Sequence, residues 1–161
     1  MNASSKRFNW SFLFFKDFYF SATGAKKDKL MLLWMDKYTE KPFDADDLSD
    51  GALRFICLAT LLLQPQLPSL ILLDEPELGL HPAAINILTG LLRKAASRAQ
   101  VIVSTQSVGL VNDLEPDDIV VVNRKGGESE FNRLNATQLS YWLNEYSMGE
   151  IWEKNIIGRP W

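Results

Sequence analysis

The feature that most constrains this chain is the segment LILLDEPELGLHP, residues 70–82, in which four apolar residues run directly into two carboxylates. An unbroken apolar run, here preceded by Pro68 and Ser69, is typical of a central parallel strand that is covered on both faces. Parallel sheets bind their ligands at the carboxyl ends of strands. Asp74 and Glu75 occupy that position, so the sequence predicts a buried strand that ends in a ligand site.

The elements predicted after residue 43 alternate between helix and strand. A helix begins after Ser49, which is a good N-cap residue, and a second helix begins at Pro82, a residue favoured in the first helical turn. The segment AQVIVST, residues 99–105, predicts a second buried strand. A strand, a Gly-Gly turn, another strand and a helix capped by Asn135 follow. We therefore expect an α/β fold with a layered, mostly parallel sheet flanked by helices.

The first 42 residues predict a separate β-hairpin or arm. Large apolar side chains alternate with other residues from Phe8 to Phe20, which favours a strand, and residues 30–35 predict its partner. Residues 1–29 carry six Lys or Arg against two acids, so this end could contact DNA. The same aromatic residues would equally serve to cover a sheet, and we prefer that interpretation.

Composition excludes several other classes of protein. The chain has 161 residues and a net charge of −3, which fits one domain or part of one and argues against a protein that is basic throughout. Cys57 is the only cysteine, so an intrachain disulfide is impossible and a reducing compartment is favoured. No apolar stretch approaches the ~20 residues that cross a bilayer. We expect a cytoplasmic protein without a membrane partner.

The chemistry of the two carboxylates points to a metal and a nucleotide. Asp74 continues the strand and would face a Mg²⁺ held near phosphates, since Mg²⁺ takes few protein ligands beside water and phosphate oxygens. Glu75 points the other way in the pleat and could polarise an attacking water. An isolated Asp-Glu pair is more often a plain strand end, so this interpretation depends on two further motifs.

These motifs lie on either side of the carboxylates. LSDGALRF, residues 48–55, offers a hydroxyl, a glycine that permits close backbone approach, and a helix N-terminus, which together suit a phosphate. VIVSTQS, residues 101–107, is a strand that ends in polar residues on the same sheet edge as Asp74. Its Gln106 could hydrogen-bond a γ-phosphate or the attacking water. Alone, each motif is an ordinary helix start or strand end.

Taken in this order, the three motifs resemble the C-terminal half of an ABC-type ATPase domain, in the RecF/SMC-like branch of predicted AAA family ATPases. The resemblance covers residues 43–161 and implies the corresponding part of a P-loop NTPase fold, with ATP and Mg²⁺ as cofactors at a shared site. It implies that Asp74 is the Walker B aspartate that organises Mg²⁺ and that Glu75 activates the water. Gln106 stands where many relatives have a switch histidine, so it would be the γ-phosphate sensor.

The same resemblance implies two groups of residues that act across a dimer. Ser49, Asp50 and Gly51 match the signature motif that contacts the γ-phosphate of ATP bound to the opposite subunit. Leu78, Gly79, Leu80 and His81 match the D-loop at the dimer seam. His81 is the only histidine and has no cysteine nearby, so a zinc site would lack ligands and a packing role in the D-loop is favoured.

The sequence contains no phosphate-binding loop of the form G-x-x-x-x-G-K-[ST], and Gly24 is the only glycine before Gly51. The resemblance then implies an ATP-binding and ATP-hydrolysing component that needs a Walker A half from a P-loop-bearing partner or homologous subunit. The alternative is a non-catalytic, truncated module that acts in dimerisation or scaffolding and could associate with DNA. A truncated gene, a fragment and one member of a split system all fit the sequence.

Overall fold

The computed structural model describes residues 15–24, 28–39 and 41–157. The chain divides into two compact units, Met1–Leu53 and Arg54–Trp161, and each is described by itself. The expected hairpin strand began at Phe8, and its part before residue 15 lies outside the described residues.

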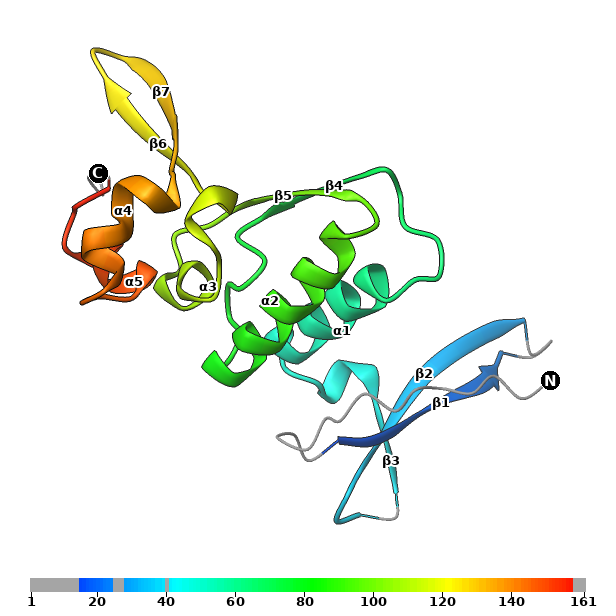
Figure 1. Ribbon diagram of the computed structural model, residues 1–161. Helices are drawn as coiled ribbons and strands as arrows, with labels where there is room; N and C mark the ends of the chain where they lie inside the picture. Colours follow the sequence, from blue (N-terminus) through cyan, green and yellow to red (C-terminus); the bar gives the residue numbers. More distant parts are fainter. Residues whose placement is uncertain (1–14, 25–27, 40, 158–161) are drawn as a thin grey trace. The chain divides into compact units, whose positions relative to one another are not determined.

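The first unit contains a three-stranded antiparallel sheet. Its strands are β1 (Phe15–Thr23), β2 (Lys29–Asp36) and β3 (Pro42–Asp44), in the order β1-β2-β3, followed by a 3₁₀ turn η1 (Ala45–Asp47) (Figure 1). Trp34 is buried, stacks on Phe43 with ring centroids 4.9 Å apart and donates from Nε1 to the Asp44 carbonyl at 2.9 Å. The N-terminal hairpin predicted from alternation is thus confirmed.

Helix α1 (Asp50–Leu62) begins in the first unit and continues into the second. Ser49 caps it as predicted, because its Oγ accepts a hydrogen bond from the Ala52 N–H at 3.2 Å. The helix buries Phe55, Ala59 and Leu62 along one side.

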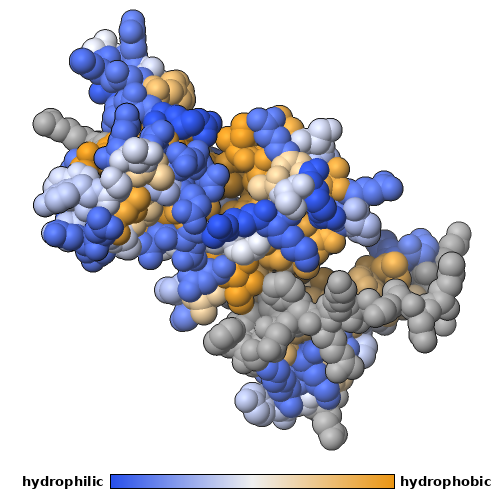
Figure 2. Space-filling model, in the orientation of Figure 1, coloured by the Kyte–Doolittle hydropathy of each residue, from blue (hydrophilic) through white to orange (hydrophobic). Residues whose placement is uncertain are grey.

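The second unit is built around one parallel strand pair. β4 (Leu70–Asp74) and β5 (Gln100–Ser104) are joined by α2 (Pro82–Ala96), and Leu72 pairs with Ile102 at the centre of the ladder. Ile71 is buried on one face, whereas Leu72 is 65% exposed and Ile102 51% exposed on the other. The prediction that this strand is covered on both faces is therefore wrong for the described structure, and Figure 2 shows apolar residues at the surface of this part of the molecule.

The sheet is also less parallel than the sequence predicted. β6 (Val120–Lys125) and β7 (Glu128–Arg133) form a separate antiparallel hairpin through the predicted Gly126-Gly127 turn, in which both glycines have positive φ. Among the described strands, β4 and β5 are the only parallel pair. The mixed α/β class is confirmed, and the mostly parallel sheet is wrong. A helix between two strands predicts that those two strands pair in parallel. It does not predict how many further strands join the same sheet.

Short helices complete the second unit: α3 (Val108–Asn112), a 3₁₀ turn η2 (Pro116–Asp118), α4 (Ala136–Leu143) and α5 (Met148–Glu153). Asn135 caps α4 as predicted, by accepting from the Thr137 N–H at 2.8 Å. A core of Val111, Leu139, Met148 and Ile151 joins these helices. In the part of the chain that the structure describes, none of the helices has both the length and the apolar character needed to cross a membrane.

Two details of α5 bear on stability. Gly149 lies so close to α3 that a Cβ there would be 2.7 Å from Val108 Cγ1. At the start of α5, Ser147 and Glu150 form a capping box, and the Glu150 carboxylate accepts from the Ser147 N–H at 2.8 Å. That backbone hydrogen bond and the bond to the Ser147 hydroxyl lower the pKa of Glu150.

Candidate functional site

The carboxyl ends of β4 and β5 meet at one edge, as the sequence predicts. Asp74 is the last residue of β4 and pairs with Ser104, the last residue of β5. The Glu75 N–H donates to the Ser104 carbonyl at 2.9 Å, which carries the pairing one residue beyond the strand. The segments that leave the two strands therefore start side by side.

Three consecutive residues at the end of β5 each hydrogen-bond a carboxylate that follows or ends β4. The Ser104 hydroxyl donates to Asp74 Oδ1, the Thr105 hydroxyl to Glu77 Oε1, and Gln106 Nε2 to Glu75 Oε1 at 3.2 Å. The structure thus brings together Asp74, the residue predicted to hold Mg²⁺, and Glu75 and Gln106, the residues predicted to be catalytic.

The backbone at Glu75 adopts an uncommon conformation. Its φ is +40°, in the left-handed region that residues with a Cβ rarely occupy. A left-handed residue of this kind costs roughly 1–2 kcal/mol and persists only where the surroundings enforce it. Here the hydrogen bonds of Glu75 to Ser104 and Gln106 are available to hold it.

The donor set at this edge fits a magnesium ion. Asp74 and Ser104 are both exposed and offer a carboxylate and a hydroxyl oxygen, the ligand types that Mg²⁺ prefers. Within residues 15–24, 28–39 and 41–157, no group of three or more His, Cys, Asp or Glu could hold a metal by itself. A cation held by one or two protein oxygens, with water and phosphate completing its shell, agrees with both observations.

Sequence reasoning missed two residues of this cluster, Glu77 and Thr105. Glu77 is only 8% exposed, and its Oε2 has no hydrogen-bond donor in the described part of the chain. Thr105 is half-buried and also accepts from the Ser107 N–H at 2.9 Å. Nothing local marks Glu77 as buried, because its hydroxyl partner is 28 residues away.

The residues predicted to form the D-loop lie in the turn between β4 and α2. Leu78 is 58% exposed, Gly79 has φ +78°, and Leu80 donates from its N–H to the Glu77 carbonyl at 2.9 Å. His81 caps α2, because its Nδ1 accepts from the Ala83 N–H at 3.2 Å. This hydrogen bond gives the only histidine a structural role.

The residues predicted to form the signature motif belong to the first unit, whereas the strand-end carboxylates belong to the second. Ser49 is the N-cap of α1, Asp50 is its first residue and Gly51 its second. Asp50 is exposed and Gly51 half-buried.

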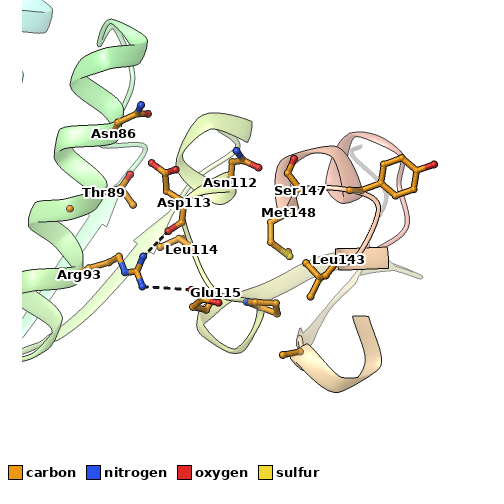
Figure 3. Close-up of a pocket in the computed structure, with 14 residues that line it drawn as sticks. Asn86, Thr89, Arg93, Asn112, Asp113, Leu114, Glu115, Leu143, Ser147 and Met148 are labelled. Atoms are coloured by element: carbon orange, nitrogen blue, oxygen red, sulfur yellow. Dashed lines mark hydrogen bonds and ion pairs between the residues drawn. The ribbon is translucent and has the colours of Figure 1, made fainter. Parts of the chain in front are cut away.

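A cleft of about 710 Å³ lies elsewhere in the second unit, among α2, α3 and α5 (Figure 3). Arg93 at its wall donates to the Asp113 carbonyl at 3.3 Å and lies 3.7 Å from the Glu115 carboxylate. None of the residues predicted to bind nucleotide or metal lines this cleft. The candidate site is therefore the strand-end cluster and not this cleft.

The fold is similar to that of SMC ATPase head domains. A structure of an SMC ATPase, from work on ATP-driven dimerisation and DNA-stimulated activation, has a TM-score of 0.55 at 18% identity and covers 73% of this chain and 72% of that one. An SMC head bound to the C-winged helix domain of ScpA has a TM-score of 0.60 at 17% identity. It covers 77% of this chain, which spans 39% of that head. A comparison with curated protein sequences found no match.

A family model matches residues 14–112, which include the signature residues, both strand-end carboxylates and Gln106. The family is described as "AAA domain, putative AbiEii toxin, Type IV TA system". The match covers more than half of the chain, and the similar structures agree with it in fold. The chain therefore belongs to this AAA-domain family of ABC-type ATPases and has the fold of an SMC-like head.

Proposed function

We propose that the chain is an ATP-binding and ATP-hydrolysing component of a RecF/SMC-like ABC ATPase, which works when a partner supplies the phosphate-binding loop. The observation that carries this proposal is the hydrogen bond from Gln106 to Glu75, beside the Ser104–Asp74 pair, at the carboxyl ends of two parallel strands. In sheets of this kind that edge is where ligands bind.

Glu75 is the residue we assign to activation of water. A general base must hold its carboxylate in one direction and within hydrogen-bond reach of the proton that it accepts. The backbone bond to Ser104 fixes the start of the side chain, and Gln106 holds Oε1 from the other side. Because Gln106 carries an amide oxygen as well as the donor, it can orient the same water or a γ-phosphate.

Asp74 and Ser104 are the residues that would hold Mg²⁺. When bound, the ion supplies positive charge that offsets the charge of the phosphate oxygens. The Ser104 hydroxyl donates to Asp74 and thereby fixes the orientation of the carboxylate.

The signature and D-loop residues are proposed to act across a subunit interface. Ser49 Oγ accepts from the Ala52 N–H, so its own proton is free to go to a phosphate oxygen of the opposite subunit's ATP. Asp50 and Gly51 follow it in the first turn of α1, where free N–H groups favour an anion. In the D-loop, the Leu78 side chain is exposed, which agrees with a residue that becomes buried at a dimer interface.

The test is reconstitution of ATP hydrolysis. The 161-residue chain is combined with a family member's segment that carries G-x-x-x-x-G-K-[ST], and phosphate release from Mg·ATP is measured with and without double-stranded DNA. Glu75→Gln should abolish turnover yet preserve ATP-dependent association, because the base is lost and the phosphate contacts remain.

Glu130→Gln is the matched control, since Glu130 is exposed on β7 and should leave turnover unchanged. Turnover that survives in Glu75→Gln would contradict the assignment of the base. Nucleotide-dependent association without any turnover would favour the non-catalytic scaffold instead. The DNA arm tests whether the DNA stimulation known for the similar SMC ATPase extends to this protein.

A further inference from the structure

A second pair of side chains lies beside the Glu75–Gln106 pair. Thr105 is flanked by Ser104 and Gln106, which both bond to predicted site residues, and its own hydroxyl donates to Glu77 instead. Thr105 therefore anchors the backbone segment from which Ser104 and Gln106 reach the site.

Glu77 and Thr105 are each tied to further structure. The Thr105 hydroxyl accepts from the Ser107 N–H at 2.9 Å, and Ser107 Oγ in turn accepts from the Leu110 N–H and caps α3. On the other side, the Glu77 carbonyl accepts from the Leu80 N–H in the D-loop turn. One partly buried side-chain hydrogen bond thus links the D-loop turn to the segment that carries Gln106.

Burial of the Glu77 carboxylate lowers the stability of the fold unless both of its oxygens find donors. A carboxylate removed from water needs donors on both oxygens to offset its desolvation, and Oε2 has none in the described residues. An apolar side chain of similar size would fill the same space without that cost. A buried carboxylate oxygen without a donor is a departure of the kind that is expected at functional positions.

We propose that Glu77 is a positioning residue. Its hydrogen bond to Thr105 fixes the backbone that follows β5, and this keeps the Gln106 side chain hydrogen-bonded to Glu75. The importance of this bond for hydrolysis rests on the proposed function, whereas the positioning itself is a property of the chain alone.

The direct readout is the mobility of the Gln106 side-chain amide, measured by ¹⁵N relaxation on the isolated, labelled chain. In the native chain its order parameter should stay above ~0.6, because Nε2 is bonded to Glu75. Thr105→Val keeps the shape and removes the donor, so the order parameter should fall below ~0.6. Thr105→Ser should restore it.

Two further variants separate the hydrogen bond from charge and from general loosening. Glu77→Gln keeps a carbonyl oxygen for Thr105 and should leave Gln106 rigid. Thr60→Val is the matched control, because the Thr60 hydroxyl donates to the Ile56 carbonyl within its own helix, α1. Thr105→Ala serves as a second variant without a hydroxyl, in case valine disturbs the packing.

A folded Thr105→Val or Thr105→Ala chain with a rigid Gln106 amide would overturn the proposal, as would a mobile amide in Glu77→Gln. These outcomes need neither nucleotide nor partner, so they are independent of whether reconstitution yields an ATPase. Where it does, Thr105→Val should lower kcat about ten- to a hundredfold with little change in KM for ATP. An unchanged kcat would overturn the link to hydrolysis.

Discussion

The left-handed backbone at Glu75 predicts an inverted order of stability for two small substitutions. Glu75→Ala and Glu75→Gly both remove the carboxylate and its bond to Gln106, and both keep the backbone bond to Ser104. They differ only in the Cβ. At φ +40°, a Cβ costs about 1–2 kcal/mol that glycine does not pay.

Glycine has its own penalty, because it loses about 0.5–1 kcal/mol more conformational freedom than alanine on folding. The difference leaves Glu75→Gly more stable than Glu75→Ala by about 0.5–1 kcal/mol, or about 1–4 °C in Tm. Urea unfolding at equal m-values measures this difference directly.

The matched control is the same pair of substitutions at Asn86, an exposed position inside α2. There the order should be the ordinary one, with alanine more stable than glycine by about 1 kcal/mol. If Glu75→Ala proved more stable than Glu75→Gly, the left-handed backbone would not be a property of the folded chain. Glu75 would then not be a residue held under backbone strain.

Three further predictions concern the fold and can be checked by urea unfolding. Ile71→Ala should cost about 2–5 kcal/mol and Leu72→Ala below about 1 kcal/mol, because only the first is buried; equal losses would mean that both faces of β4 are covered. Gly149→Ala should destabilise by about 1–3 kcal/mol through its clash with α3, whereas Gly90→Ala, with open space around it in α2, should stabilise by about 1 kcal/mol. The lowered pKa of Glu150 means that its ionised carboxylate stabilises the folded chain at pH values above the usual pKa of 4.5. This stabilisation is lost as the pH falls through the lower pKa of the folded state. The Glu150→Gln variant should therefore lack this pH-dependent stabilisation at pH 7.

The part of the site that the sequence predicted is the part that depends on strand ends. Asp74 and Gln106 follow apolar runs, and parallel strands bring their carboxyl ends together, so the contact between the two segments follows from topology. The Glu77–Thr105 bond has no such pattern behind it. It depends on a turn that brings the Glu77 carboxylate back to Thr105, and residue types alone do not report that path.

The errors about the sheet have a related cause. An apolar run such as residues 70–73 reports that both faces of a strand avoid water in the final assembly, but it does not say what covers them. In the described residues one face of β4 packs inward, and Leu72 on the other face stays exposed.

The sequence predicted the β6–β7 turn correctly from its two glycines, because a tight hairpin needs positive φ at those positions.

The turn after β4 departs from two local rules within three residues. Glu75 adopts a backbone conformation that its side chain disfavours, and Glu77 buries a carboxylate with one oxygen that has no donor in the described residues. Each feature carries a local cost that an uncharged residue with an ordinary backbone would avoid. Both features hold a side chain of the strand-end cluster in a fixed direction. Local costs of this kind cluster at functional sites, so their position at one edge of the sheet supports the hydrolytic role that we propose for this turn over a purely structural one.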